Sequence, residues 1–235
     1  MSRALSSAQL KLDSYNSVAS EYYDADAHPT CRNFRDASRF ILREALLKLP
    51  REGWAVEVGA GDSLTGELGQ GAFEKLILFD KSEAMLSHSR RFQSFADLVI
   101  GDALALPFSD RSISLIVASL ADPFNVSQFW NEVHRTLKVG AYCIFTTPSH
   151  EWASSFRQKS TCEHEGAARF QLRSGEHVYL PSLVQPEGSQ IEMIRRTGLS
   201  LITTNSITAD AIPQPHSPKI KGCKVIVSGF VVRRI

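Results

Sequence analysis

The sequence lacks an excess of charge of either sign. Its 235 residues carry 26 Lys and Arg against 25 Asp and Glu, a formal net charge of +1. Such a chain has no basic surplus for non-specific binding to a phosphate backbone, which argues against nucleic acid as a partner. It also lacks the low hydrophobicity of disordered chains, because 43% of its residues are hydrophobic. We therefore expect a folded chain that buries a large core.

Cysteines are few, and long hydrophobic runs are absent. The cysteines, Cys31, Cys143, Cys162 and Cys223, are far apart, form no CxxC pair and show no zinc-ligand spacing. We expect reduced thiols and no metal site. No apolar run approaches the ~20 residues that cross a bilayer. Residues 1–14 contain no stretch like the core of a secretory signal, so we expect a cytoplasmic protein without a membrane partner.

What the sequence does contain is an alternation of short apolar runs and helix-like segments. Apolar runs of this length suit strands that are buried on both faces, as in a parallel sheet. Strands are predicted at Trp54–Val58, Lys75–Phe79, Ala96–Ile100, Ile113–Leu120 and Ala141–Thr147. Helices are predicted at Asp36–Leu49, Ser82–Phe95 and Ser127–Leu137. The alternation predicts an α/β fold with a doubly wound, Rossmann-like sheet.

The last third of the chain follows a different pattern. Glu151–Gln185 shows no clear period and is expected to form a loop and a short hairpin that turns at Ser174 and Gly175. Gln190–Thr197 predicts a helix, and Leu199–Ile207 and Lys224–Val232 predict two closing strands. These strands would complete a sheet of about seven strands, mostly parallel, with an antiparallel edge strand.

A glycine-containing turn follows the first predicted strand, in the run from Glu57 to Ser63. Glycines at this place let the backbone turn sharply and approach a ligand, although a plain tight turn needs them too. In open α/β sheets, ligands bind at the carboxyl ends of the strands. Position 64 is Leu, so the third glycine of the dinucleotide fingerprint G-x-G-x-x-G is missing, which argues against a nicotinamide site.

Two aspartates end the second and third predicted strands. Asp80 lies about 20 residues after the glycines, where a carboxylate can accept hydrogen bonds from both hydroxyls of a ribose. Asp102 is placed to accept a hydrogen bond from an adenine amino group. Either residue alone is also compatible with a turn aspartate. Together with the glycines they place polar groups at one edge of the sheet.

The runs VEVGAGDS, LILFDKSEAML and GDALALPFSDRSISLIVAS resemble class I S-adenosylmethionine-dependent methyltransferases, most closely the small type 11 and type 25 domains. The resemblance implies S-adenosyl-L-methionine as cofactor and S-adenosyl-L-homocysteine as product. The residues that it places at the cofactor are Tyr15, Tyr22, Glu57, Gly59, Ala60, Gly61, Asp80, Lys81, Met85, Asp102, Ala103, Ser119 and Leu120. Where the family usually has a third glycine, this chain has Ser63.

The same resemblance gives these residues roles. Glu57, Gly59 and Gly61 would cradle the methionine part, and Asp80 would hold the ribose. Met85, Asp102 and Ala103 would surround the adenine, while Ser119 and Leu120 would lie under the sulfonium.

The N-terminal residues resemble a lid that folds over the cofactor in this family. Tyr15, Ala19 and Tyr22 fit the pattern Y-x-x-x-A-x-x-Y, and either tyrosine could bond the methionine carboxylate or simply pack on the sheet. We expect residues 1–50 to form a helical lid that contacts substrate. Residues 51–235 would form the core, with 150–185 inserted as a substrate cap.

Candidate acceptor-binding residues lie outside the cofactor motifs. His28 is a candidate general base because histidine is a common acid and base in catalysis, although a loop histidine can also be merely solvated. Arg32 and Arg35 could pair with a carboxylate or phosphate of the substrate. The others are Asp122, which follows the fourth strand, and His150 and Trp152 in the expected cap.

The leading hypothesis is a methyltransferase that acts on an O, N, S or C atom of a small molecule, as a monomer or homodimer. Alternatives are a methyltransferase of protein or RNA, a nicotinamide-dependent oxidoreductase, and an inactive cofactor-binding module. A basic stripe or an added recognition domain would mark the first alternative, and the sequence shows neither.

Overall fold

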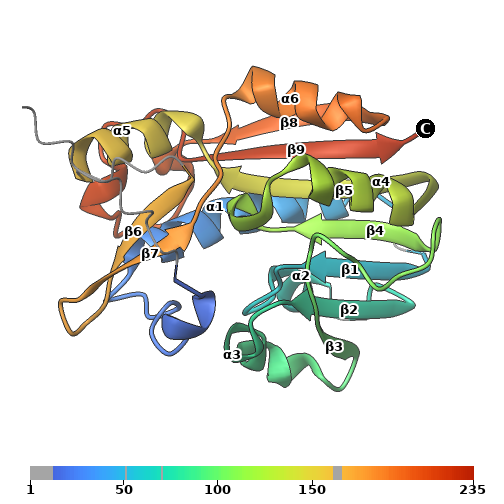
Figure 1. Cartoon of the computed structure of the whole chain (residues 1–235), viewed down its shortest axis with the longest axis horizontal. Coiled ribbons are helices and arrows are strands. Elements are labelled where there is room, and N and C mark those ends of the chain that lie inside the picture. The colour runs from blue at the N-terminus through green and yellow to red at the C-terminus, as the bar shows by residue number, and fades with distance from the viewer. Residues whose placement is uncertain (1–12, 51, 70, 161–165) are drawn as a thin grey trace, which may run out of the picture.

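A seven-stranded sheet forms the centre of the computed structural model, which describes residues 13–50, 52–69, 71–160 and 166–235 (Figure 1). Its strand order is β3-β2-β1-β4-β5-β9-β8. The strands are β1 (Trp54–Val58), β2 (Lys75–Asp80), β3 (Ala96–Ile100), β4 (Ile113–Ala118), β5 (Leu137–Pro148), β8 (Leu199–Ile207) and β9 (Val227–Arg234). Of the four cysteines, Cys162 lies outside the described residues.

Strand direction confirms the predicted fold class. β1 pairs in parallel with β2 and β4, and β3 and β5 extend the parallel part on either side. β9 is antiparallel to both β5 and the edge strand β8. The chain runs outward from β1 to β3 and then returns to β4, so the strand order reverses between β1 and β4. In α/β sheets this reversal opens a crevice at the carboxyl ends of the strands.

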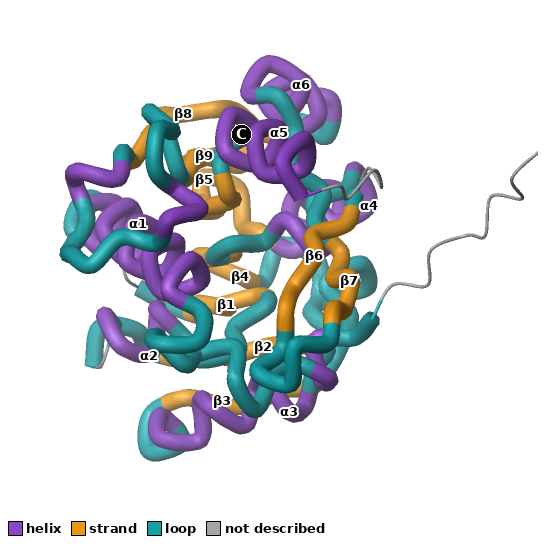
Figure 2. Tube along the Cα trace, turned by 90° about the vertical axis from the view of Figure 1, so that its left-hand side faces the viewer, coloured by secondary structure: helices purple, strands orange, loops and turns teal. Residues whose placement is uncertain are grey.

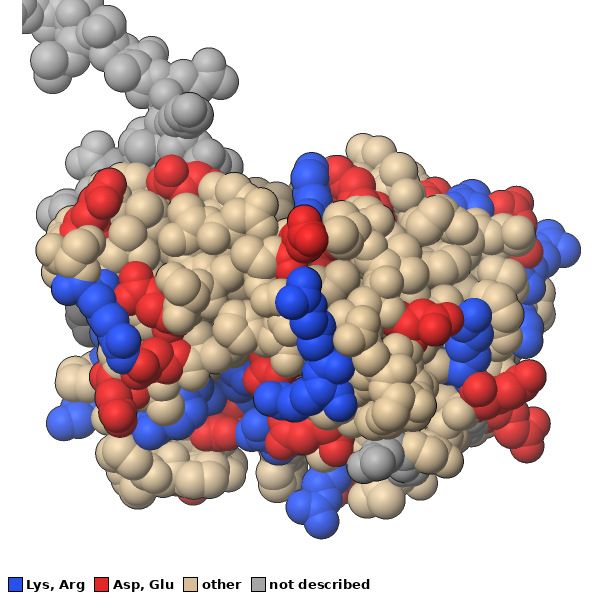
Figure 3. All heavy atoms as spheres, turned by 90° about the horizontal axis from the view of Figure 1, so that it is seen from below, with Lys and Arg blue, Asp and Glu red and all other residues tan. Residues whose placement is uncertain are grey.

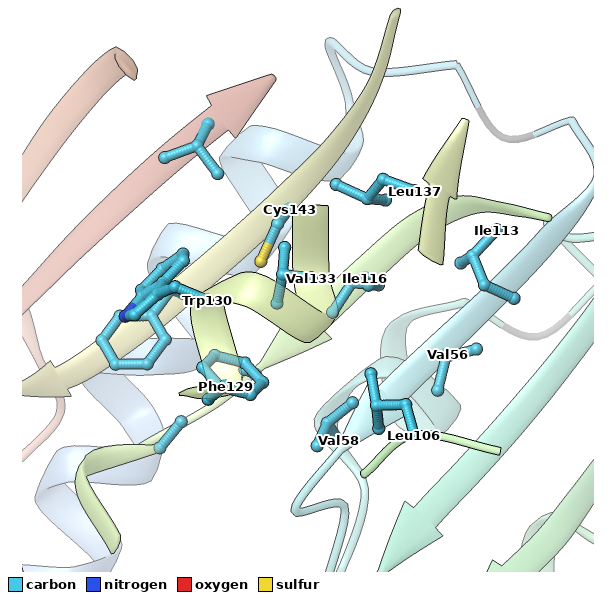
Figure 4. Close-up of a cluster of buried hydrophobic side chains, with 14 of the residues drawn as sticks. Val56, Val58, Leu106, Ile113, Ile116, Phe129, Trp130, Val133, Leu137 and Cys143 are labelled. Atoms are coloured by element: carbon cyan, nitrogen blue, oxygen red, sulfur yellow. The ribbon is translucent and has the colours of Figure 1, made fainter. Parts of the chain in front are cut away.

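Helices cover both faces of the sheet because strand side chains alternate between two apolar clusters. The helices are α1 (Pro29–Leu46), α2 (Leu64–Leu68), α3 (Glu83–Leu86), α4 (Ser127–Thr136), α5 (His150–Ser160) and α6 (Glu187–Arg196). Phe129, Trp130 and Val133 of α4 pack against Val56 and Val58 of β1 in one cluster (Figure 4). α1 and α2 pack on the opposite face. None of the helices in the described ranges is long and apolar enough to cross a membrane.

A separate hairpin lies beyond the carboxyl ends of the parallel strands. It consists of β6 (Ala167–Gln171) and β7 (His177–Pro181), which pair in antiparallel fashion around the predicted turn. The N-terminal segment, with the 3-10 helix η1 (Tyr15–Ser17), runs beside this hairpin, and Figure 2 shows both at the same end of the sheet. Other 3-10 helices are η2 (Ser87–Phe92), η3 (Asp122–Phe124), η4 (Ala209–Ala211) and η5 (Pro218–Ile220).

Several predicted boundaries are wrong for local reasons. The fourth strand ends at Ala118, because Leu120 adopts a left-handed conformation with φ of 51° that no strand can continue. The helix expected at Ser82–Phe95 is one α-helical turn followed by η2. The segment expected as a loop from Glu151 contains the helix α5. The first helix begins at Pro29, because proline suits a first helical position.

Candidate functional site

A cavity of about 620 Å³ opens where the strand order reverses. This volume lies within the ~300–1,000 Å³ range of sites for small molecules. The cavity is lined by residues at the ends of β1 to β4 and by the N-terminal segment. Most residues predicted at the cofactor line it: Tyr15, Tyr22, Glu57, Gly59, Ala60, Asp80, Lys81, Met85, Asp102, Ala103, Ser119 and Leu120. Gly61 does not line it directly but is bonded to Asp80.

Glu57 shapes the glycine turn rather than presenting a free carboxylate. It is buried, and its Oε2 accepts hydrogen bonds from Ser63 Oγ and, at 3.0 Å, from the backbone N–H of Thr65. Ser63 Oγ in turn accepts from the N–H of Gly66 at 2.7 Å and caps α2. Burial raises the pKa of Glu57. The residue that replaces the third glycine therefore has a structural role of its own at the start of a helix.

The backbone at Gly59 requires glycine. Its φ is 71°, and a Cβ placed there would lie 2.7 Å from the ring of Phe124, which also lines the cavity. A side chain at this position would displace Phe124 and narrow the cavity. The observed turn thus fits the predicted close approach of the backbone to a ligand.

Asp80 joins the ends of two strands. Its Oδ2 accepts a hydrogen bond from the N–H of Gly61 at 2.9 Å, and its Oδ1 accepts one from the N–H of Ser82 at 2.8 Å. Burial raises the pKa of Asp80, against the lowering effect of these bonds. Each carboxylate oxygen has more than one acceptor position, so the group can still accept hydrogen bonds from a diol in the cavity.

Asp102 and Lys81 form an ion pair at the end of the cavity formed by β2 and β3. Lys81 Nζ lies 2.8 Å from Asp102 Oδ2, and the N–H of Leu104 donates to Asp102 Oδ1 at 2.9 Å. The hydrogen bond from Lys81 is the main cause that lowers the pKa of Asp102. The carboxylate therefore stays ionised near neutral pH and can accept a bond from an exocyclic amine.

The N-terminal segment forms a roof over the cavity. Asn16 Oδ1 accepts from Ser82 Oγ at 2.6 Å and from the N–H of Ala84 at 3.4 Å. At the other side, the N–H of Asp13 donates to the carbonyl of Tyr179 on β7 at 2.7 Å, and Asp13 Oδ2 accepts from the N–H of Tyr179 at 2.9 Å. The predicted lid residue Tyr15 donates to Pro181 O at 3.4 Å. The roof is thereby tied to both α3 and the hairpin.

A cluster of charges lies beside the glycine turn. Asp62 Oδ2 pairs with Arg35 Nη2 at 3.1 Å, while its Oδ1 pairs with Arg91 Nη2 at 2.7 Å. Arg35 also packs 4.8 Å from the ring centre of Tyr23, whose hydroxyl accepts from the N–H of Asp62 at 2.8 Å. Two guanidinium groups on one carboxylate leave a net positive charge, and Arg35 lines the cavity.

The end of the cavity beyond β4 is mainly apolar and aromatic. The side chains there come from the roof, the turn after β4 and the segment after β7, and they are Tyr15, Tyr22, Leu120, Pro123, Phe124 and Leu183. Burial raises the pKa of both tyrosines well above 10. Their hydroxyls therefore remain neutral and can donate hydrogen bonds but not act as bases near neutral pH.

Leu120 is a strained residue in this end of the cavity. Its φ of 51° lies in the left-handed region, which costs a non-glycine residue about 1–3 kcal/mol. Such residues persist only where the surrounding structure fixes them, and they cluster at functional sites. The neighbouring Ser119 Oγ is buried and has no hydrogen-bond partner among the described residues.

Two residues predicted to act on the acceptor, His28 just before α1 and Arg32 within it, make their contacts outside the cavity. His28 Nε2 lies 3.4 Å from Glu21 Oε2, and its ring packs 4.3 Å from that of Phe170 on β6. Arg32 donates to the carbonyl of Pro215. Neither residue lines the cavity, whereas Arg35 does.

The remaining substrate candidates also lie outside the cavity lining. Asp122 is buried, and its carbonyl accepts from the N–H of Leu183 at 2.8 Å. His150 is exposed and lies 3.2 Å from Ser154 Oγ. Trp152 is buried in an apolar cluster, with its ring 4.6 Å from that of Phe34. Trp152 therefore has a packing role.

Several residues that line the cavity were not predicted from the sequence. Asn16, Tyr23 and Leu183 carry no motif, and their contacts join segments that are distant in the sequence. Within the described part of the chain, no group of three His, Cys, Asp or Glu residues is arranged to hold a metal ion.

These features fit S-adenosylmethionine. The cavity offers a diol acceptor in Asp80, an amine acceptor in Asp102 and a cation for a carboxylate in Arg35. These groups come from the end of β2, the turn after β3 and α1, and they line the cavity together with the glycine turn, where the backbone leaves no room for a Cβ at Gly59.

Comparison with known proteins agrees with this assignment. Residues 56–145 match the model of a family described as a methyltransferase domain. A malonyl-[acyl-carrier protein] O-methyltransferase from Marinomonas sp. is 28% identical over 196 residues, which are 79% of this chain and 65% of that protein. The chain thus spans less than two thirds of the length of this curated relative.

Solved structures share the fold. An S-adenosylmethionine-dependent methyltransferase from Methanosarcina mazei superposes with a TM-score of 0.64 at 15% identity, over 82% of this chain and 97% of that one. A geranyl diphosphate C-methyltransferase from Streptomyces coelicolor, in complex with S-adenosyl-L-homocysteine, gives a TM-score of 0.62 at 12% identity, over 85% and 77%.

Proposed function

The chain is a member of the class I S-adenosylmethionine-dependent methyltransferases, and from this premise we propose that it methylates a small-molecule acceptor. One observation carries the choice of a small acceptor. The apolar end of the cavity lies under the roof formed by the N-terminal segment and the hairpin, and this roof is tied down on both sides. A site of this kind suits a small acceptor with an apolar part.

The cofactor end of the cavity supports the donor assignment. We assign Asp80 to the ribose hydroxyls and Asp102 to the adenine amino group, as the sequence predicts. Arg35 is assigned to the methionine carboxylate, because it is the lining cation beside the glycine turn and Asp62. Ser119 and Leu120 lie next to the glycine turn in the same cavity and are assigned to the reacting end.

Methyl transfer needs little covalent help from the protein. When bound, S-adenosylmethionine supplies an electrophilic methyl group on a positively charged sulfur. The chain's own contribution is to orient the acceptor in line with that methyl group and to exclude water. Tyr15, Tyr22 and Phe124 would provide the packing surface for the acceptor.

The proposal assigns no proton transfer to His28, which lies outside the cavity lining. An acceptor that is already ionised at neutral pH, such as a carboxylate, would need only orientation. The curated relative is named for O-methylation of a malonyl group on an acyl carrier protein. This name makes a carboxylate the first acceptor class to test.

The surface agrees with a small acceptor rather than a polyanion. On the face shown in Figure 3, Lys and Arg side chains are interspersed with Asp and Glu rather than gathered into a continuous basic stripe. The net charge of +1 gives no general attraction to nucleic acid. Protein and RNA acceptors remain outcomes of the experiment below.

Transfer of a labelled methyl group tests the proposal. The protein is incubated with S-adenosylmethionine labelled in the methyl group and with an extract of the source cells. The extract is then separated into small molecules, protein and RNA. We expect label in the small-molecule fraction, and an Asp80→Ala variant should greatly reduce it. Label in only the protein or RNA fraction would contradict the acceptor class, and no label in any fraction would favour an inactive binding module.

A further inference from the structure

The turn after β4 contains a residue whose backbone conformation needs an external restraint. Leu120 lines the cavity with φ at 51°, a region that L-residues other than glycine avoid because of contact between Cβ and the backbone. The parallel pairing of β4 with β5 ends just before this turn, at Ala118 opposite Phe145. Beyond that pair, the regular parallel pairing of β4 with β5 stops.

Thr146, the residue after Phe145, supplies the restraint. Its Oγ1 accepts a hydrogen bond from the N–H of Leu120 at 2.9 Å, and its carbonyl accepts one from the N–H of Ala121, also at 2.9 Å. One residue of β5 therefore binds two consecutive N–H groups of the turn. The side-chain hydroxyl takes the place that a backbone carbonyl occupies within the ladder.

A second buried hydroxyl holds Thr146 itself. Ser38 Oγ of α1 lies 2.9 Å from Thr146 Oγ1, and both side chains belong to residues that are 0% exposed. The chain of contacts runs from α1 through β5 to the backbone of Leu120. Thr146 does not line the cavity, so it does not touch a ligand.

We propose that Thr146 is a positioning residue for methyl transfer. It acts through Leu120, because it holds the turn in the left-handed conformation and so places Ser119 and Leu120 at the reacting end of the cavity. The inference rests on the proposed function, since the ligand that senses this placement is S-adenosylmethionine or its product.

The test compares isosteric variants by calorimetric binding of S-adenosylhomocysteine. Thr146→Val keeps the side-chain shape but leaves the Leu120 N–H without an acceptor, and we expect a loss of affinity of about tenfold. Thr146→Ser retains the hydroxyl and should stay within about twofold of the wild type. Thr147→Val is the matched control, since Thr147 is buried on the same strand and its hydroxyl donates to the carbonyl of Pro148 rather than holding the turn after β4.

A double-mutant cycle separates positioning from general destabilisation. Glycine adopts the left-handed conformation without the steric cost of a Cβ. In a Leu120→Gly background, Thr146→Val should therefore reduce the affinity by a smaller factor than in the wild-type background. A general loss of stability would give the same factor in both backgrounds.

The outcomes distinguish failure of the proposed function from failure of the role of Thr146. If the wild-type protein does not bind S-adenosylhomocysteine, the proposed function and the role of Thr146 both fall. If it binds, and Thr146→Val behaves like Thr147→Val, only the role of Thr146 is overturned. Should Thr146→Val fail to fold, Ser38→Ala replaces it, with an expected loss of about threefold through the freed Thr146 hydroxyl. Equality of Ser38→Ala with Thr147→Val would then overturn the role.

Discussion

Asp80 Oδ2 accepts a hydrogen bond from the backbone N–H of Gly61 at 2.9 Å, so the acidic residue that ends β2 also fixes the glycine turn after β1. Replacing Asp80 removes the proposed ribose contact and frees this turn. We predict that Asp80→Ala weakens binding of S-adenosylhomocysteine by about 1.5–3 kcal/mol, measured by calorimetry. Asp80→Asn keeps one oxygen for Gly61 and should lose less. An unchanged affinity in Asp80→Ala would refute the assignment of Asp80 to the ribose.

The raised pKa of Asp80 predicts opposite pH trends for stability and binding. Because burial raises its pKa in the folded state, the folded protein favours the neutral carboxyl. The contribution of Asp80 to the free energy of unfolding is therefore most favourable below the unfolded pKa near 3.8 and falls as pH rises through the folded pKa. Binding of ligand to the ionised carboxylate should follow the reverse course and weaken as pH falls through the same pKa.

The measurement is the difference between the wild type and Asp80→Asn, which cancels the titration of other groups such as Glu57. Urea unfolding and binding of S-adenosylhomocysteine are followed between about pH 4 and pH 7. A difference that does not vary with pH would show that Asp80 does not titrate in this range.

Arg35 and Arg91 bind the same carboxylate from different sides and make a matched pair. Both contact Asp62, but the Arg35 side chain is 14% exposed and lines the cavity, whereas that of Arg91 is 53% exposed. We expect Arg35→Ala to weaken binding of S-adenosylhomocysteine by about tenfold or more, because the cavity loses the cation beside the glycine turn and its packing on Tyr23. Arg91→Ala should cost less than about threefold. Equal losses in the two variants would argue against a direct contact of Arg35 with the ligand.

The hydrogen bonds of Asn16 allow a prediction about how firmly the roof is held. Its Oδ1 accepts from both Ser82 and Ala84, so Asn16→Ala should loosen the N-terminal segment from α3. We predict faster hydrogen exchange in residues 13–23 and faster release of S-adenosylhomocysteine, with a smaller effect on the exchange of the central sheet. Asn16→Asp retains an acceptor and serves as the control. Release rates that match between Asn16→Ala and the wild type would show that the roof does not govern access to the cavity.

The central sheet could be predicted from sequence because its signals are local. The runs at β1 and β3 have the predicted bounds. β1 is buried along most of its length, and such a strand appears as a continuous apolar run. The closing strand at Leu199–Ile207 was likewise predicted in full. The end of β4 was not, because the left-handed conformation of Leu120 and its contact with Thr146 have no signal in the local sequence.

The cofactor end of the site could also be predicted, because motif residues fall at the ends of consecutive strands. The roof could not be predicted in the same detail. Asn16 and Ser82 are 66 residues apart, and Tyr23 and Asp62 are 39 apart, so neither contact has a signal in local periodicity. His28 and Trp152, in contrast, were predicted at the site but do not line the cavity. Polar or aromatic side chains near a site were expected to face it, but tertiary packing directs them to Phe170 and Phe34 instead.

Direct comparison of ligands by calorimetry tests the central claim most sharply, because it asks only what the cavity binds. The full chain is titrated in separate experiments with S-adenosylhomocysteine and with NAD. The assigned roles of Asp80, Asp102 and Arg35 predict saturable binding of S-adenosylhomocysteine at one site per chain. The missing third glycine, with Leu at position 64, predicts no binding of NAD. Saturable binding of NAD without binding of S-adenosylhomocysteine would contradict the account.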